Sequence, residues 1–201
     1  MYITCLDLEG VLVPEIWIAF SEVSGIPELR RTTRDEPDYD KLMRWRMDIL
    51  REHGLGLKQI QDVSAQIDPL PGAKEFLDEL RATTQAVIVS DTFEEFAQPL
   101  MKKLGWPTIL CNSLVVSASG EITDFTMRCP QSKLTTVRAF QSIGYKTIAA
   151  GDSYNDLDMI LASHAGFLFR STEKIKADHP QLPAFETYDE LLNGILGAMR
   201  A

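Results

Sequence analysis

Tyr2-Ile3-Thr4-Cys5-Leu6-Asp7-Leu8-Glu9-Gly10 is the stretch that decides the fold. Its apolar and β-branched run, Tyr2–Leu8, is bounded by a glycine, and this combination predicts a buried strand. We expect further buried strands at Ala86–Ser90, Ile148–Ala150 and Gly166–Phe169. Thr108–Val116 is predicted to be a more exposed strand, followed by a hairpin turn at Ser119-Gly120.

Helical patterns alternate with these strands. The spacing of apolar residues predicts helices over Gly72–Arg81, Phe93–Leu104, Lys133–Ile143, Ser153–Ala162 and Tyr188–Met199. Alternation of strands and helices is typical of a doubly wound α/β fold with a parallel sheet. We therefore predict a Rossmann-like core.

One long segment interrupts the alternation. From Pro14 to about Asp68 no strand is predicted, only helices over Glu15–Val23, Asp38–His53 and Leu57–Ile67. The turn residues Pro69-Leu70-Pro71-Gly72 then mark the return to the α/β pattern. An insert after the first strand would cover the carboxyl ends of the strands, where α/β sheets bind ligands. We expect a helical cap at 14–69 on a core formed by 1–13 and 70–201.

Composition excludes several classes of function. The 201 residues include 20 basic and 29 acidic ones, a net charge of −9 that disfavours binding to nucleic acids or anionic membranes. The three cysteines and three histidines have no spacing typical of a zinc site or a disulfide framework. No apolar run is long enough to span a bilayer. We expect a soluble cytoplasmic protein, either a monomer or a homodimer.

Acidic and hydroxyl side chains gather where the predicted strands end. Because the carboxyl ends of parallel strands meet at one edge, acids from distant parts of the chain would share a pocket. Such carboxylates need a counter-ion, and an all-oxygen ligand set favours Mg²⁺. Each pair alone is typical of an ordinary turn or helix cap. The residues concerned are Asp7 and Glu9, Ser90-Asp91-Thr92, and Asp152 with Asn155 and Asp156.

Lys133 adds a basic group to this set. Helical projection places it on the apolar face of its helix, with Leu134, Val137, Phe140 and Ile143, and places Thr135, Thr136 and Arg138 on the opposite face. A lysine in the first turn also opposes the helix dipole. Lys133 either extends from the rim of the core or faces the acidic cluster as a charge clamp.

Taken in order, these residues resemble the haloacid dehalogenase superfamily of phosphotransferases. That superfamily has Asp-x-Asp after the first strand, Ser or Thr after the second, then a Lys, and finally paired acids in a loop. The matching positions span residues 7 to 156: Asp7 and Glu9, Ser90, Lys133, and Asp152 with Asp156.

The resemblance implies a role for each residue. Asp7 would attack phosphorus and form an aspartyl-phosphate. Glu9 would protonate the leaving alcohol and then deprotonate the acceptor. Ser90 and Lys133 would hold the phosphoryl oxygens. Mg²⁺ would be held by Asp7, the backbone carbonyl of Glu9, Asp152 and, directly or through water, Asp156, which would otherwise position Lys133.

Two features resemble the phosphoserine phosphatase branch of this superfamily. They are the helical insert and the string Asp7-Leu8-Glu9-Gly10-Val11-Leu12-Val13-Pro14-Glu15. Phosphoserine also carries a carboxylate and an ammonium. Arg46 points along the apolar face of the helix Asp38–His53 and suits the carboxylate. An internal ion pair with a cap acid such as Glu22 or Asp48 is the alternative.

Glu15 matches the position that contacts the substrate ammonium in that branch. The alternative is an ordinary acid in the first turn of a helix.

Three departures from the usual phosphoserine phosphatase motifs restrict the resemblance to a subgroup of that branch. Glu9 replaces the usual Asp, Ser90-Asp91-Thr92 replaces Ser-Gly-Gly, and Ser153-Tyr154 replaces small residues. A subgroup with these changes resembles phosphoserine:homoserine phosphotransferases, in which homoserine can replace water as the phosphoryl acceptor. The resemblance implies simple phosphoserine hydrolysis as a concurrent activity. Asp91 would crowd the pocket or bond a second alcohol or amine, and Asn155 would contact the substrate.

Other functions explain the sequence less well. A receiver domain also gathers acids, a hydroxyl and a lysine around Mg²⁺, but it takes phosphate on a middle strand and has no cap. A nucleotide-binding enzyme lacks support because no Gly-x4-Gly-Lys-Ser/Thr string occurs. A capped phosphatase of another small phosphomonoester is the nearest alternative, and only Arg46 and Glu15 argue against it.

Overall fold

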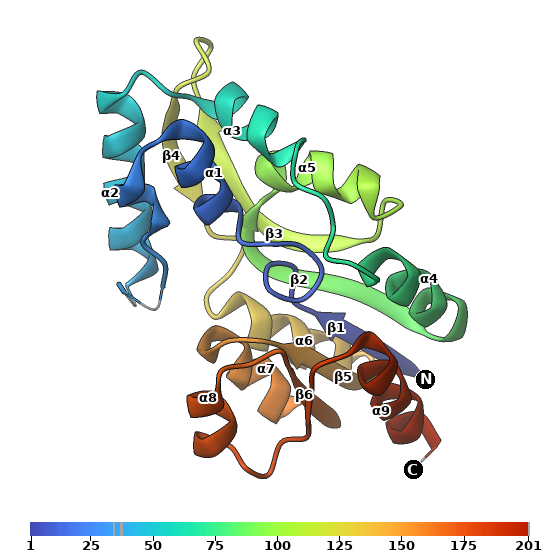
Figure 1. Cartoon of the computed structure of the whole chain (residues 1–201). Coiled ribbons are helices and arrows are strands. Elements are labelled where there is room, and N and C mark those ends of the chain that lie inside the picture. Colours follow the sequence, from blue (N-terminus) through green and yellow to red (C-terminus); the bar gives the residue numbers. More distant parts are fainter. Residues whose placement is uncertain (34, 37, 201) are drawn as a thin grey trace.

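The computed structural model describes residues 1–33, 35–36 and 38–200. In this part of the chain one sheet has the strand order β4-β3-β2-β1-β5-β6-β7, and only β4 is antiparallel to its neighbour (Figure 1). The strands are β1 (Tyr2–Leu6), β2 (Gln85–Phe93), β3 (Ile109–Val116), β4 (Ile122–Thr126), β5 (Lys146–Gly151), β6 (Ala165–Phe169) and β7 (Ala184–Phe185).

Helices cover both faces of the sheet (Figure 1). Those described are α1 (Ile16–Ser24), α2 (Tyr39–Glu52), α3 (Leu57–Ser64), α4 (Ala73–Thr83), α5 (Glu94–Lys103), α6 (Ser132–Ser142), α7 (Leu157–Ala162), α8 (Glu173–Asp178) and α9 (Tyr188–Arg200), with short 3-10 helices η1 (Pro27–Arg30) and η2 (Tyr154–Asp156). Helices α4, α5 and α9 pack on one face, and α6 and α7 on the other. Along β1, Ile3 and Cys5 enter one apolar layer and Leu6 the other, since successive side chains point to opposite faces. The predicted doubly wound α/β fold is confirmed.

Several boundaries differ from the prediction. The first strand ends at Leu6 instead of Leu8, and the helix predicted from Ser153 begins as η2 before α7. The predicted turn at Ser119-Gly120 joins two antiparallel strands, β3 and β4, as a hairpin. The elements that sequence patterns did not identify are short: η1, α8 and β7. Such elements carry too few apolar positions to show a clear period.

The predicted faces of α6 were partly wrong. Ile143 lies beyond the last helical residue and is 70% exposed, whereas Thr136 is buried. The hydroxyl of Thr136 donates to the carbonyl of Ser132, so a polar side chain is accommodated on the inner face.

Residues 14–69, hereafter the insert, hold α1, η1, α2 and α3. The insert packs beside the β3–β4 hairpin (Figure 1). The amide of Leu57 donates to the carbonyl of Gly120, and Arg51 pairs with Glu121. The division into a core and a cap domain stays a prediction. Among the described helices, none has the length and apolar character needed to cross a bilayer.

Candidate active site

The site lies between β1 and β5, where the order in which the chain adds strands to the sheet reverses. Strands β1 and β5 are adjacent and parallel, although they come from opposite halves of the chain. The amide of Asp7 continues the ladder by donating to the carbonyl of Ala150 at 3.1 Å. Asp7 and Asp152, which follow the two strands, therefore emerge side by side. Ligands bind at this point of an open α/β sheet.

Strand β2 contributes an irregular segment rather than a strand end. We predicted that it stops at Ser90, but it continues to Phe93. Its register against β3 shifts between Val89 and Phe93, so Ser90, Asp91 and Thr92 lie in the irregular part. Irregularities of this kind release backbone groups from the ladder and redirect side chains. The amide of Thr92 accordingly approaches the hydroxyl of Ser90 at 3.3 Å.

Lys133 lies in the centre of the acidic cluster. Its Nζ is 3.0 Å from Asp7 Oδ2 and 2.6 Å from Asp156 Oδ1, and the residue is buried. Burial by itself would lower the pKa of Lys133, but Asp156 and Asp7 outweigh it and hold the pKa well above its ordinary value. The lysine is thus a charged clamp and does not extend from the rim of the core.

Asp7, Asp152 and Asp156 offer carboxylate oxygens that all lie within 4.8 Å of one another. Burial raises the pKa of Asp7 well above its ordinary value, and Asp156 and Asp152 raise it further. When all three acids are ionised, their charge exceeds that of Lys133, which contacts Asp7 and Asp156, and a divalent cation would neutralise the excess. The donors are hard oxygens, as Mg²⁺ prefers.

Gly10 adds a steric observation to this fit. A Cβ on Gly10 would lie 2.6 Å from the carboxyl carbon of Asp152, and its φ is +77°. Only glycine lets the loop approach this carboxylate so closely. The residues present therefore fit a magnesium site formed by Asp152 and its neighbours.

Asp156 also organises its own loop. Its Oδ2 accepts the amides of Asp152 and Ser153 at 3.1 Å each, while Oδ1 faces Lys133. Both oxygens are thus engaged within the protein, an arrangement that suits positioning of Lys133 and of the Asp152 loop.

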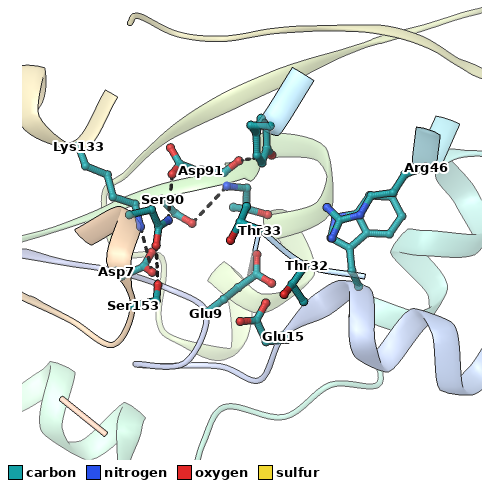
Figure 2. A pocket seen from close by; sticks show the side chains of 14 residues that line it. Asp7, Glu9, Glu15, Thr32, Thr33, Arg46, Ser90, Asp91, Lys133 and Ser153 are labelled. Carbon is teal, nitrogen blue, oxygen red and sulfur yellow. Dashed lines mark hydrogen bonds and ion pairs between the residues drawn. The ribbon is translucent and has the colours of Figure 1, made fainter. Parts of the chain in front are cut away.

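A cavity of about 80 Å³ opens beside this cluster. Figure 2 shows Asp7, Ser90 and Lys133 on one side, Arg46 on the other, and Glu9 and Glu15 between them. Asp91 and Asn155 also line it, so all eight predicted catalytic and substrate-binding residues meet in one space. Lining residues that sequence reasoning missed are Trp17, Thr32, Thr33 and Tyr39. Thr92 and Ser153, which the motifs contain but to which no role was given, also line the cavity.

Arg46 is buried at the far end of this cavity. Its guanidinium lies 4.4 Å from the centre of the Trp17 ring, and Nη2 donates to the carbonyl of Arg31 at 2.7 Å. Nε has no hydrogen-bond partner among the described residues. The alternative ion pairs are wrong, because Glu22 pairs with Arg30 and Asp48 with Arg51.

Burial and the neighbouring charges act on the pKa of Arg46 in opposite directions. Burial lowers the pKa of Arg46 to about 10, although Glu9 and Glu15 oppose the shift. It remains a cation at neutral pH, and its buried Nε–H is unpaired among the described residues.

Glu9 lies between the two ends of the cavity. Burial and the nearby Glu15 carboxylate raise the pKa of Glu9 to about 8. Its Oε2 accepts the amide of Ile16 at 2.8 Å, so the side chain points toward the insert. The Glu9 carboxylate is outside the group formed by Asp7, Asp152 and Asp156. A metal contact from Glu9 therefore depends on its backbone carbonyl and stays a prediction.

Glu15 precedes α1 as its N-cap residue instead of lying in its first turn. Its side chain makes no capping hydrogen bond and lines the cavity instead. The ordinary helical role is thus not the one it has here.

Both carboxylate oxygens of Asp91 accept hydrogen bonds. Its Oδ1 accepts from Ser132 Oγ at 2.8 Å and its Oδ2 from Asn155 Nδ2 at 3.1 Å. These bonds fix the carboxylate at the edge of the cavity and fix Asn155 beside it.

Comparison with known proteins agrees with this geometry. The haloacid dehalogenase-like hydrolase family matches residues 5–164, which include Asp7, Ser90, Lys133 and Asp152. The chain belongs to this family. A relative named phosphoserine phosphatase ThrH, from Pseudomonas aeruginosa, is 54% identical over 198 residues, covering 98% of this chain and 97% of the relative. A phosphoserine phosphatase of Pseudomonas syringae pathovar tomato is 53% identical, covering 94% of this chain and 80% of the relative.

Solved structures agree on the fold of this family member. A substrate-bound phosphoserine phosphatase complex superposes with a TM-score of 0.78 at 20% identity, over 96% of this chain and 97% of the other. A phospho-aspartyl intermediate analogue of phosphoserine phosphatase gives 0.77 at 19% identity, with the same coverage. At these identities the likeness establishes the fold alone.

Proposed function

We propose that this protein is a Mg²⁺-dependent phosphoserine phosphatase that also transfers the phosphoryl group to homoserine. The observation that carries the proposal is the order of charges along one cavity. Lys133 beside Asp7 suits a phosphate, Glu15 an ammonium, and Arg46 a carboxylate. The printed names of the two Pseudomonas relatives support the same substrate.

The reaction would take place in two steps on Asp7. A carboxylate oxygen of Asp7 attacks phosphorus and forms an aspartyl-phosphate, while serine leaves with a proton from Glu9. Since the pKa of Glu9 is about 8, it holds that proton at neutral pH. Glu9 then takes a proton from water or from the homoserine hydroxyl, whose oxygen attacks phosphorus and regenerates Asp7.

The other residues hold the transferring group. Ser90 and Lys133 would bind the phosphoryl oxygens, with Asp156 fixing the lysine at 2.6 Å. Asp7 and Asp152 would hold Mg²⁺, with Asp156 adjacent; when bound, the ion supplies positive charge that screens the approach of one anion to another. Arg46 and Glu15 would orient the amino-acid end of the substrate.

The test is ³¹P NMR of phosphoserine incubated with the protein and Mg²⁺, with and without homoserine. Asp7→Asn is the inactive control. Phosphohomoserine formation supports the full proposal, and inorganic phosphate alone supports only the phosphatase. If phosphoserine is untouched while an aryl phosphate is cleaved, the protein acts on another phosphomonoester, and the roles given to Arg46 and Glu15 are wrong.

A further inference from the structure

The backbone carbonyl of Asp91 receives two hydrogen bonds from distant parts of the chain. Tyr39 Oη donates to it at 2.7 Å, and Asn112 Nδ2 donates to it at 3.0 Å. This carbonyl belongs to the irregular part of β2, where the ladder with β3 is interrupted. Its orientation is therefore set by these two side chains rather than by the sheet.

Four elements meet at this one residue. The carboxylate of Asp91 is held by Ser132 from α6 and Asn155 from η2, and its carbonyl by Asn112 from β3 and Tyr39 from α2. Of these four donors, Tyr39 alone comes from the insert. The Tyr39 hydroxyl thus joins the insert directly to the segment that follows Ser90.

The ring of Tyr39 is fixed so that its hydroxyl points at this carbonyl. It stacks on Phe93 with ring centres 6.4 Å apart and meets the Phe125 ring edge-on at 6.3 Å. Burial raises the pKa of the Tyr39 hydroxyl, so it keeps its proton and remains a donor at any pH of interest. The donor is thus held in place before any ligand binds.

The contact also lies in a wall between two spaces. A second, outer cavity of about 550 Å³ adjoins the first, and Tyr39, Asp91, Asn155 and Lys133 line both. Tyr39 and Asp91 therefore lie where the two cavities adjoin.

We propose that Tyr39 is a positioning residue. Its hydroxyl joins the insert by a hydrogen bond to the segment Ser90–Thr92 and so aligns this segment for phosphoryl transfer. The bond sets the plane of the peptide after Asp91, and with it the amide of Thr92 beside the Ser90 hydroxyl. The proposal rests on the proposed phosphotransfer at Asp7, but it applies to any phosphomonoester.

The test compares Tyr39→Phe with Gln61→Met. Phe keeps the ring contacts and removes only the hydroxyl. Gln61 is a matched control, because its side chain also joins the insert to a core carbonyl, that of Glu95 at 3.0 Å, but does not line the cavity. Turnover is measured with phosphoserine and with p-nitrophenyl phosphate, together with melting temperature and hydrogen exchange by mass spectrometry.

We expect Tyr39→Phe to lower kcat by roughly 3- to 10-fold for both substrates, as loss of one buried hydrogen bond would. Amides of residues 90–93 should exchange faster by a similar factor, whereas Gln61→Met changes neither. Equal kcat and equal exchange at 90–93 in the two variants would contradict the positioning role of Tyr39. If phosphoserine is not a substrate of the wild type, the proposed function fails, and the aryl phosphate and the exchange data still test Tyr39.

Discussion

Replacing Gly10 with alanine is expected to disable the site without unfolding the protein. Gly10 has φ +77°, and an added Cβ would lie 2.6 Å from the carboxyl carbon of Asp152 and 2.7 and 2.8 Å from its two oxygens. Ordinary van der Waals contact begins near 3.4 Å. Since Asp152 is buried, its carboxylate must move by nearly an ångström into a packed environment.

The expected effect of Gly10→Ala has two parts, a loss of stability and a loss of turnover. A left-handed backbone conformation costs an alanine about 1–2 kcal/mol, which for a domain of this size lowers the melting temperature by roughly 2–8 °C. Displacement of a carboxylate by about 1 Å in a reacting site lowers kcat by about 100-fold. Gly25→Ala separates the two parts, because Gly25 has φ +70° and no atom within 4 Å of the added Cβ.

The assay is phosphate release from phosphoserine over a range of Mg²⁺ concentrations, with melting curves of both variants. Gly25→Ala should lose stability and keep its turnover. Gly10→Ala should lose at least as much stability and also need more Mg²⁺, with kcat about 100-fold lower. Wild-type kcat and an unchanged Mg²⁺ requirement in Gly10→Ala would refute the placement of Asp152 at the metal.

Four further outcomes are expected. With a pKa of about 8, Glu9 loses its proton as pH rises through 8, so kcat/KM for phosphoserine should fall there; a similar fall in Glu9→Gln would contradict its role as the acid. The folded state also binds this proton more tightly than the unfolded chain, so unfolding free energy should decrease between about pH 4.5 and 8 and do so less in Glu9→Gln. Arg46→Lys should raise KM for phosphoserine by roughly 10- to 100-fold and spare p-nitrophenyl phosphate; equal effects on both would exclude carboxylate binding. Because burial raises the pKa of the Cys5 thiol to about 12, alkylation at pH 8, followed by mass spectrometry, should label half-buried Cys129 well before Cys5, and equal rates would show that β1 opens readily.

The sequence by itself determined the sheet and which side chains gather at its edge. Runs such as Tyr2–Leu8 carry their strand signal locally, although β1 itself ends at Leu6, and an acid just after such a strand stays at the strand end however the helices pack. Asp7 and Asp152 could therefore be placed together before any coordinate was known. Arg46 on an apolar helix face was likewise recognisable, since a buried cation requires a partner or a cavity.

Tertiary structure alone decided how the insert meets the core. Tyr39 and Asp91 are 52 positions apart, and nothing near either residue in the chain indicates that one bonds the other. The register shift in β2 was hidden for the same reason, because a bulge depends on which residues of β3 lie opposite. Sequence periodicity reports which face of an element is apolar, whereas contacts of this kind depend on the relative placement of whole elements.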